Sequence, residues 1–252
     1  MSDLFDVSGR TVLVTGGGRG IGRMIADGFA DAGAEVHVVS RRLDEQELSE
    51  AGLRPWTADL STETGCRDFA AEFSAETGRL DVLVNNAGAT WGAPLEEFDT
   101  AAWDKVLDLN LKSPFFLVRE LVGLLEKSAR ADDPSRVVNV GSIDGLRVPT
   151  LSTYSYTASK AALHHLTRVL AVELGPRGIT VNAIAPGPFE SKMMAAVLAE
   201  SREEFEGAAP LGRIGRPDDA AALAILLASP GGSYLTGTVI ALDGGLSIVS
   251  PR

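Results

Sequence analysis

Short, wholly apolar runs separated by longer segments of helical periodicity constrain the fold of this 252-residue chain more than any other feature. Residues 12–14 (Val-Leu-Val) and 82–84 (Val-Leu-Val) are apolar at every position. A strand with one face in water would instead alternate apolar and polar residues. Strands covered on both faces are typical of a parallel sheet between two layers of helices. We therefore expect a single α/β domain over residues 1–252, built on a doubly wound parallel sheet.

The same pattern predicts where the strands lie. We expect about seven strands. Six lie at residues 11–15, 35–40, 80–85, 136–140, 180–185 and 238–242, and a more weakly marked one lies at residues 54–58. No linker rich in Pro, Ser or charged residues divides the chain. The segment 188–210 joins the sixth strand along the chain to the next clear helix and is long enough to form a lid over a substrate. Packing of this segment as a helix against the body of the domain is the alternative. A lid would offer an apolar substrate Met193, Met194, Val197 and Leu198.

Charge limits the classes of partner. There are 23 Lys and Arg residues against 34 Asp and Glu residues, which gives a net charge of −11. This balance disfavours nucleic acid and anionic membrane surfaces. The single cysteine, Cys66, excludes an internal disulfide, and the first residues lack the basic and apolar regions of a secretion signal. We expect a cytoplasmic protein whose partner is a small molecule.

A glycine cluster follows the first strand, in the order Gly16, Arg19, Gly20, Ile21 and Gly22. Glycines at a strand-to-helix turn allow backbone amides to approach a pyrophosphate, and the positive end of the next helix favours its charge. A turn that is merely tight is the alternative. The position near the start of an α/β pattern favours a dinucleotide and a Rossmann-type domain.

The second strand ends without the acidic residue that commonly binds the ribose 2′-hydroxyl of NAD. Ser40 and Arg41 stand there instead, and Arg19 lies in the glycine cluster. Ser40 can hydrogen-bond a 2′-phosphate and the two arginines can neutralise its charge. This favours NADP(H), with solvated loop charges as the alternative.

Tyr156 and Lys160 are one helical turn apart in a segment whose apolar residues recur every three or four positions. A phenol loses its proton near pH 10, so a nearby ammonium would ease proton exchange around neutrality. Ser142 lies at the carboxyl end of a predicted strand, where open α/β sheets place ligands. A Tyr and a Lys four apart also occur on many solvated helices, so their spacing alone is weak evidence.

Five ordered motifs change that assessment: Thr15 to Gly22, Asn85-Asn86-Ala87-Gly88, Asn110, Ser142, and Tyr156 with Lys160. With these motifs the chain resembles the short-chain dehydrogenase/reductases over essentially its whole length. Pro186-Gly187 and the closing Asp243-Gly244-Gly245 extend the resemblance.

The resemblance implies a catalytic role for four residues. Ser142 would hold the substrate oxygen and Tyr156 would exchange a proton with it. Lys160 would bind the nicotinamide ribose and lower the phenol pKa, and Asn110 would hold a water that relays protons to Lys160. Tyr156 and Lys160 would thus also contact the cofactor.

The resemblance also implies further cofactor contacts, from Asp59, Leu60, Asn86, Ala87, Gly88, Pro186, Gly187 and Ser191. Asp59 and Leu60 would lie against the adenine, although a helix cap near Ser61 is an alternative for Asp59. Asn86, Ala87 and Gly88 would pass beneath the adenosine ribose. Pro186 and Gly187 would line the nicotinamide, and Ser191 stands where the family often has a threonine.

Within the family the chain looks most like 3-oxoacyl reductases and sugar or polyol dehydrogenases, and the segment after Lys160 is similar to the reductase associated with rhamnolipid synthesis. We therefore expect an NADP(H)-dependent enzyme that reduces a ketone to a secondary alcohol. A sugar or polyol dehydrogenase is the first alternative, and a nicotinamide-binding sensor without catalysis is the second. Carrier-dependent reductases commonly have a basic residue at the position of Val172, so docking of an acyl carrier protein is in doubt.

Two apolar segments, 115–125 and 161–174, carry more hydrophobic surface than one buried helix face requires. We expect them to pair across a two-fold axis in a homodimer or homotetramer. The histidines at 37, 164 and 165 form no metal-binding pattern with carboxylates or Cys66, so we expect no catalytic metal. A strand surface and a helix face are the expected places of these histidines.

Overall fold

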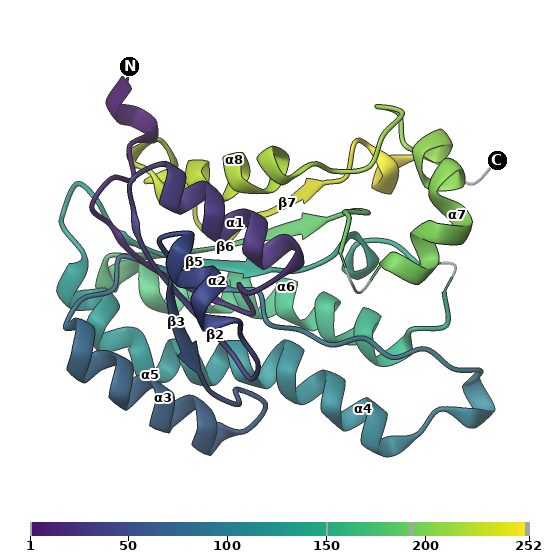
Figure 1. Cartoon of the computed structure of the whole chain (residues 1–252), viewed down its shortest axis with the longest axis horizontal. Coiled ribbons are helices and arrows are strands. Elements are labelled where there is room, and N and C mark those ends of the chain that lie inside the picture. The colour runs from purple at the N-terminus through teal and green to yellow at the C-terminus, as the bar shows by residue number, and fades with distance from the viewer. Residues whose placement is uncertain (1, 150, 192–193, 250–252) are drawn as a thin grey trace.

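The computed structural model describes residues 2–149, 151–191 and 194–249. Its centre is a parallel sheet of seven strands in the order β3-β2-β1-β4-β5-β6-β7 (Figure 1). Every strand lies within two residues of its predicted range, and the predicted fold class is confirmed. The bounds are β1 Thr11–Thr15, β2 Glu35–Ser40, β3 Arg54–Thr57, β4 Val82–Asn85, β5 Ser135–Val140, β6 Ile179–Pro186 and β7 Val239–Leu242.

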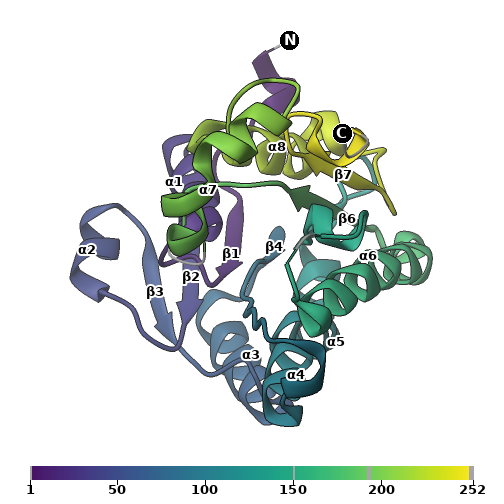
Figure 2. The same ribbon diagram turned by 90° about the vertical axis from the view of Figure 1, so that its right-hand side faces the viewer.

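Helices cover both faces of this sheet (Figures 1 and 2). On one face lie α1 and α8, which pack against each other, and on the opposite face lie α3, α5 and α6. The bounds are α1 Gly20–Asp31, α2 Glu45–Glu50, α3 Glu63–Thr77, α4 Thr100–Leu107, α5 Ser113–Ser128, α6 Tyr154–Leu174, α7 Ala195–Ala208 and α8 Pro217–Ala228.

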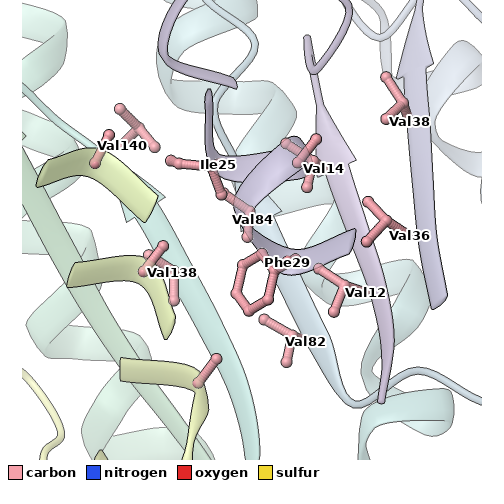
Figure 3. Close-up of a cluster of buried hydrophobic side chains, with 14 of the residues drawn as sticks. Val12, Val14, Ile25, Phe29, Val36, Val38, Val82, Val84, Val138 and Val140 are labelled. Atoms are coloured by element: carbon pink, nitrogen blue, oxygen red, sulfur yellow. The ribbon is translucent and has the colours of Figure 1, made fainter. Parts of the chain in front are cut away.

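The apolar runs divide their side chains between the two helix layers. Val12 and Val14 of β1 point toward α1, where they meet Phe29, while Leu13 between them packs on the other face. Figure 3 shows the first of these cores around Phe29. Alternate residues of a strand face opposite sides of a sheet, so a strand buried on both sides must be apolar throughout.

The strand order reverses between β1 and β4, which are neighbours in the sheet but not in the chain. Open α/β sheets bind their ligands beyond the carboxyl ends of the strands at such a reversal. In this protein the glycine cluster follows β1 and the segment from Asn86 to Gly88 follows β4.

The prediction of a surface position was wrong for His37. Its side chain is 1% exposed, and its Nδ1 accepts a 2.9 Å hydrogen bond from Trp56 Nε1. The ring also packs edge-on against Phe73. Trp56 and Phe73 come from β3 and α3, so the contacts that bury His37 are tertiary.

Metal-binding clusters and membrane-spanning helices are both absent from the described residues. These residues contain no group of three or more His, Cys, Asp or Glu side chains suited to hold a metal ion. Nor does any helix among them have the length and apolar character needed to span a bilayer.

Candidate active site

The glycine cluster makes a tight turn directly against the segment that follows β4. Gly16 and Gly20 have φ values of 65° and 57°, a region that side chains disfavour. A Cβ on Gly22 would overlap the Asn86 side chain and would lie 2.7 Å from Gly16 O. Ile21 is half-buried between these glycines. At these glycines the turn therefore presents bare backbone at the first turn of α1.

Thr15 ties this turn to the neighbouring strand. Its Oγ1 accepts hydrogen bonds from the backbone N–H groups of Asn86 and Ala87, both at 2.9 Å. The Asn86 side chain in turn donates to Thr15 O at 2.9 Å. These hydrogen bonds fix the loop after β1 against the loop after β4, where the strand order reverses.

The end of β2 presents a hydroxyl and a cation, and a second cation, Arg19, lies in the glycine cluster before α1. Ser40 is half-buried, whereas Arg19 and Arg41 are exposed. Within residues 2–149, 151–191 and 194–249, neither arginine forms an ion pair, although Arg41 lies close enough to Asp59 to help hold the pKa of that carboxyl below its usual range. Their positive charge is therefore available to an anion at this edge.

Asp59 belongs mainly to a local turn. Its Oδ1 accepts from the backbone N–H of Ser61 at 3.0 Å and from its hydroxyl at 2.7 Å, and these bonds are the main cause of the lowered pKa of Asp59. The helix cap of α3 is Thr62, which accepts from Gly65 N at 3.0 Å. The side chain of Leu60 is buried in the core with Cys66.

Lys160 reaches the same edge from α6. Its side chain is 5% exposed, and its Nζ donates a 2.7 Å hydrogen bond to Val140 O at the end of β5. A Cβ on Gly88 would stand 3.8 Å from Nζ, so Gly88 borders the ammonium. Burial lowers the pKa of Lys160 to about 8, and the ammonium form still predominates at neutral pH.

Tyr156 lies one turn before Lys160, with its ring centroid 5.6 Å from Lys160 Nζ. Burial raises the pKa of the Tyr156 phenol to about 12, while the Ser142 hydroxyl opposes the rise and the charge of Asp144 adds to it. Ser142 therefore lies beside the phenol. The predicted trio of Ser142, Tyr156 and Lys160 does come together at one place.

Asn110 is part of a π-helical turn, Asp108–Lys112, between α4 and α5. Its side chain accepts from Ala89 N at 2.8 Å and donates to Ala89 O at 2.9 Å and to Ser159 Oγ at 3.0 Å. Both amide atoms are thus occupied by protein groups.

The turn after β6 closes the opposite side of the site. Pro186 ends the strand, and Gly187 donates to Leu242 O at 3.0 Å. A Cβ on Gly187 would stand 2.8 Å from the Cβ of Asp243, which explains the need for glycine there. Ser191 reaches the start of α1, because a Cβ on Gly20 would lie 3.2 Å from the Cβ of Ser191.

The predicted lid segment contains α7, which is kinked at Ser201. The side chain of Arg202 is paired with both Glu190 and Glu206, so it joins α7 to the turn after β6. Met193 lies outside the described residues, as do the side chains of Val197 and Leu198. Met194 N donates to Ser191 O at 3.0 Å.

Sequence reasoning did not identify two neighbours of Ser142. Asp144 is half-buried on the turn that follows it, and burial raises the pKa of this carboxyl. His164 lies on a helix face as expected, but that face is buried, one turn beyond Lys160. Its spacing of four from Lys160 was a readable signal, because residues four apart on a helix share a face.

Aromatic and aliphatic side chains lie on the two loops that follow Gly88 and Ser142. The loop after β4 and the loop before α6 meet where Ala93 N donates to Ser152 O at 3.2 Å. Phe98 stacks edge-on against both Trp103 and Tyr154. Several large apolar side chains from these loops are exposed: Trp91, Leu95, Leu146, Val148 and Leu151.

The chain is similar to known reductases and dehydrogenases over nearly its whole length. A family model described as enoyl-(acyl carrier protein) reductase matches residues 16–247. The rhamnolipid biosynthesis 3-oxoacyl-[acyl-carrier-protein] reductase of Pseudomonas aeruginosa is 44% identical, over 98% of this chain and all of that protein. The 2-dehydro-3-deoxy-D-gluconate 5-dehydrogenase of Pseudoalteromonas atlantica is 36% identical, over 97% of this chain and 98% of that protein.

Among solved structures, the active-site complex of Pseudomonas aeruginosa RhlG with NADP superposes with a TM-score of 0.94. The two sequences are 43% identical, and the match covers 98% of this chain and all of the RhlG chain. The match spans both the glycine cluster and the Tyr156 helix.

Proposed function

The chain belongs to the short-chain dehydrogenase/reductase family, and from that premise we propose that it is an NADP(H)-dependent oxidoreductase that reduces a ketone to a secondary alcohol. The observation that carries the proposal is the meeting of Ser142, Tyr156 and Lys160 at the carboxyl edge of β5. A hydroxyl, a phenol and a buried ammonium are the groups that a carbonyl oxygen needs while it gains a proton.

The residues around the glycine cluster fit a dinucleotide phosphate. The close approach of Gly16 and Gly22 to Asn86 leaves backbone where a pyrophosphate would lie. Ser40, Arg41 and Arg19 would hold the 2′-phosphate, and the absence of an acid at the end of β2 removes a source of repulsion. When bound, the nicotinamide supplies or accepts the hydride.

Ser142 would position the substrate. Its Oγ accepts from Asp144 N at 3.1 Å, so its own O–H is left to donate to the carbonyl oxygen of a ketone. Tyr156 would then give its proton to the same oxygen as hydride reaches the carbon. A phenol that keeps its proton at neutral pH suits this reducing direction.

Lys160 would stabilise the negative charge that proton transfer leaves on Tyr156. Its ammonium is 5.6 Å from the Tyr156 ring and would stabilise the phenolate that remains after proton transfer. The same ammonium would bind the nicotinamide ribose. Asn110 supports this region through the Ala89 backbone and Ser159, and its main-chain carbonyl would hold the relay water.

The substrate is proposed to be a free ketone or a thioester of a small carrier such as coenzyme A. Val172 is 79% exposed where carrier-dependent reductases commonly place a basic residue, and the lid segment ends in acids at Glu203 and Glu204. Neither feature attracts an acidic carrier protein. The exposed apolar side chains on the loops after β4 and before α6 favour a substrate with an apolar chain.

Sugar and polyol dehydrogenases are the alternative, because relatives such as the gluconate 5-dehydrogenase of Gluconobacter oxydans, 33% identical, cover 98% of this chain. We further propose that segment 188–210 is a lid over the substrate, and that α5 and α6 pair two subunits. Exposed apolar side chains on these two helices support the pairing.

The test is oxidation of NADPH and NADH by the purified protein with acetoacetyl-coenzyme A, small diketones and keto-sugars. Polyols with NADP⁺ test the reverse direction. We expect NADPH turnover with a 3-oxo compound, and a loss of at least roughly a thousandfold in kcat in Tyr156→Phe. Tyr234→Phe is the matched control, because this tyrosine is fully exposed between α8 and β7.

Each result separates the hypotheses. Preference for NADH would contradict the assignment of Arg19 and Arg41. Turnover of polyols alone would favour the sugar dehydrogenase. Cofactor binding without turnover of any compound would favour the sensor.

A further inference from the structure

His164 is a buried group that the proposed mechanism does not use. It lies one turn beyond Lys160 on α6, and Lys160 lies one turn beyond Tyr156, so the three share one helix face. Its side chain is 2% exposed. The face of α6 that carries Tyr156 and Lys160 therefore also carries the buried imidazole of His164.

The imidazole contacts the backbone of Ser142. Ser142 N donates a long hydrogen bond of 3.4 Å to His164 Nε2. The Ser142 hydroxyl is held separately, since its Oγ accepts from Asp144 N at 3.1 Å. The position of Ser142 is thus determined at its backbone by α6 and at its side chain by the turn that follows.

Two glycines make room for the ring. A Cβ on Gly141 would overlap His164 Nε2, and a Cβ on Gly145 would stand 2.8 Å from Cε1. Neither glycine has a positive φ, so backbone conformation does not require glycine at either position. The imidazole alone explains glycine at 141, whereas a Cβ on Gly145 would stand equally close, at 2.8 Å, to the backbone of Lys160 and Ala161.

We propose that His164 is a positioning residue for Ser142. Its Nε2 accepts a hydrogen bond from the backbone N–H of Ser142 and so holds Ser142 with its hydroxyl facing the substrate oxygen. This role rests on the proposed function. It assigns the ring one tautomer, with Nε2 unprotonated and the proton on Nδ1.

The surroundings of the ring keep it neutral. Burial and the charge of Lys160 lower the pKa of His164 to about 4, with Arg168 acting in the same direction and the Gly145 backbone in the opposite one. A ring that stays neutral through the working range of pH can accept a hydrogen bond and does not exchange protons with substrate. Its Nδ1 is buried and has no hydrogen-bond partner within the described part of the chain.

The first experiment compares His164→Met with His164→Gln. Methionine fills the space with a sulfur that is only a weak acceptor, whereas the amide oxygen of glutamine can replace Nε2. With the best ketone found for the wild type, we expect kcat to fall about tenfold in His164→Met because Ser142 loses its fixed position. We expect His164→Gln to recover most of kcat, while the affinity for NADPH stays unchanged in both variants.

The second experiment measures the ring tautomers of the folded wild type by ¹⁵N NMR, so it needs neither activity nor a variant that folds. His37 is the internal contrast. Its Nδ1 accepts from Trp56, so its proton lies on Nε2, opposite to the arrangement expected for His164. Replacement of the exposed His165 by Gln assigns the third ring signal.

An Nε2–H tautomer at His164 would overturn the role, as would wild-type kcat in His164→Met or equal losses in the Met and Gln variants. All three results leave the proposed function intact. Absence of ketone turnover in the wild type would instead overturn the proposed function, and the role of His164 with it.

Discussion

Lys160 Nζ donates a 2.7 Å hydrogen bond to the carbonyl oxygen of Val140, two residues before Ser142. This bond joins the middle of α6 to the last residue of β5. It holds an ammonium in a buried place beside the Tyr156 ring. Burial of that charge has a cost in stability that can be measured.

Lys160→Met is expected to stabilise the cofactor-free protein at pH 7 while it abolishes turnover. Lowering of the Lys160 pKa from 10.5 to about 8 corresponds to about 3 kcal/mol. Loss of the hydrogen bond to Val140 destabilises the variant by about 1 kcal/mol, which leaves a net gain of about 2 kcal/mol in the free energy of unfolding. Urea denaturation and the kcat of both proteins check the prediction.

The pH dependence of that difference has a definite sign. Between about pH 8 and pH 10.5 the unfolded state binds more protons at Lys160 than the folded state does, so wild-type stability gains with rising pH. The advantage of Lys160→Met should therefore shrink through this window. Lys127→Met is the control for loss of a lysine, because exposed Lys127 also donates to a backbone carbonyl, that of Gly78.

Arg41→Ala is expected to raise KM for NADPH by about 10- to 100-fold, the worth of a charge-assisted hydrogen bond to phosphate. KM for NADH should change little, because NADH lacks the 2′-phosphate. Arg42→Ala, at the next exposed position, is the matched control for overall charge. Equal losses for both cofactors in Arg41→Ala would argue against a 2′-phosphate site.

Asp144→Asn is expected to shift alcohol oxidation toward lower pH. The charge of Asp144 raises the pKa of Tyr156, on which Ser142 acts in the opposite direction. Removal of that charge lowers the phenol pKa, and oxidation requires the phenolate. The pH profile of kcat/KM in the oxidative direction measures the shift, with Asp68→Asn on distant α3 as control. An unchanged profile would mean that Asp144 does not act on Tyr156.

Val172→Asp is expected to weaken self-association. Val169 and Val172 on α6 are 52% and 79% exposed, and a two-fold axis along this helix would bring two copies of the new charge together. Sedimentation velocity of the wild type and the variant measures the change. Val148→Asp, on a loop outside α5 and α6, should keep the wild-type assembly. A monomeric wild type would contradict the proposed pairing.

Local patterns predicted the strands and the candidate groups because their causes are local. A run such as Val12 to Val14 must be covered on both faces, and Tyr156 and Lys160 must share a face on any helix. The glycines at 16, 20 and 22 announced a close backbone approach for the same reason.

The tertiary structure decided what surrounds those groups. The burial of His37 depends on Trp56 and Phe73 from other elements, and nothing in its own strand reveals it. The contact of His164 with Ser142 exists only because α6 packs against the end of β5. Sequence by itself determined which chemical groups lie at the carboxyl edge of the sheet. Packing between distant segments decided which of them touch, since burial and hydrogen bonding depend on neighbours that chain distance does not specify.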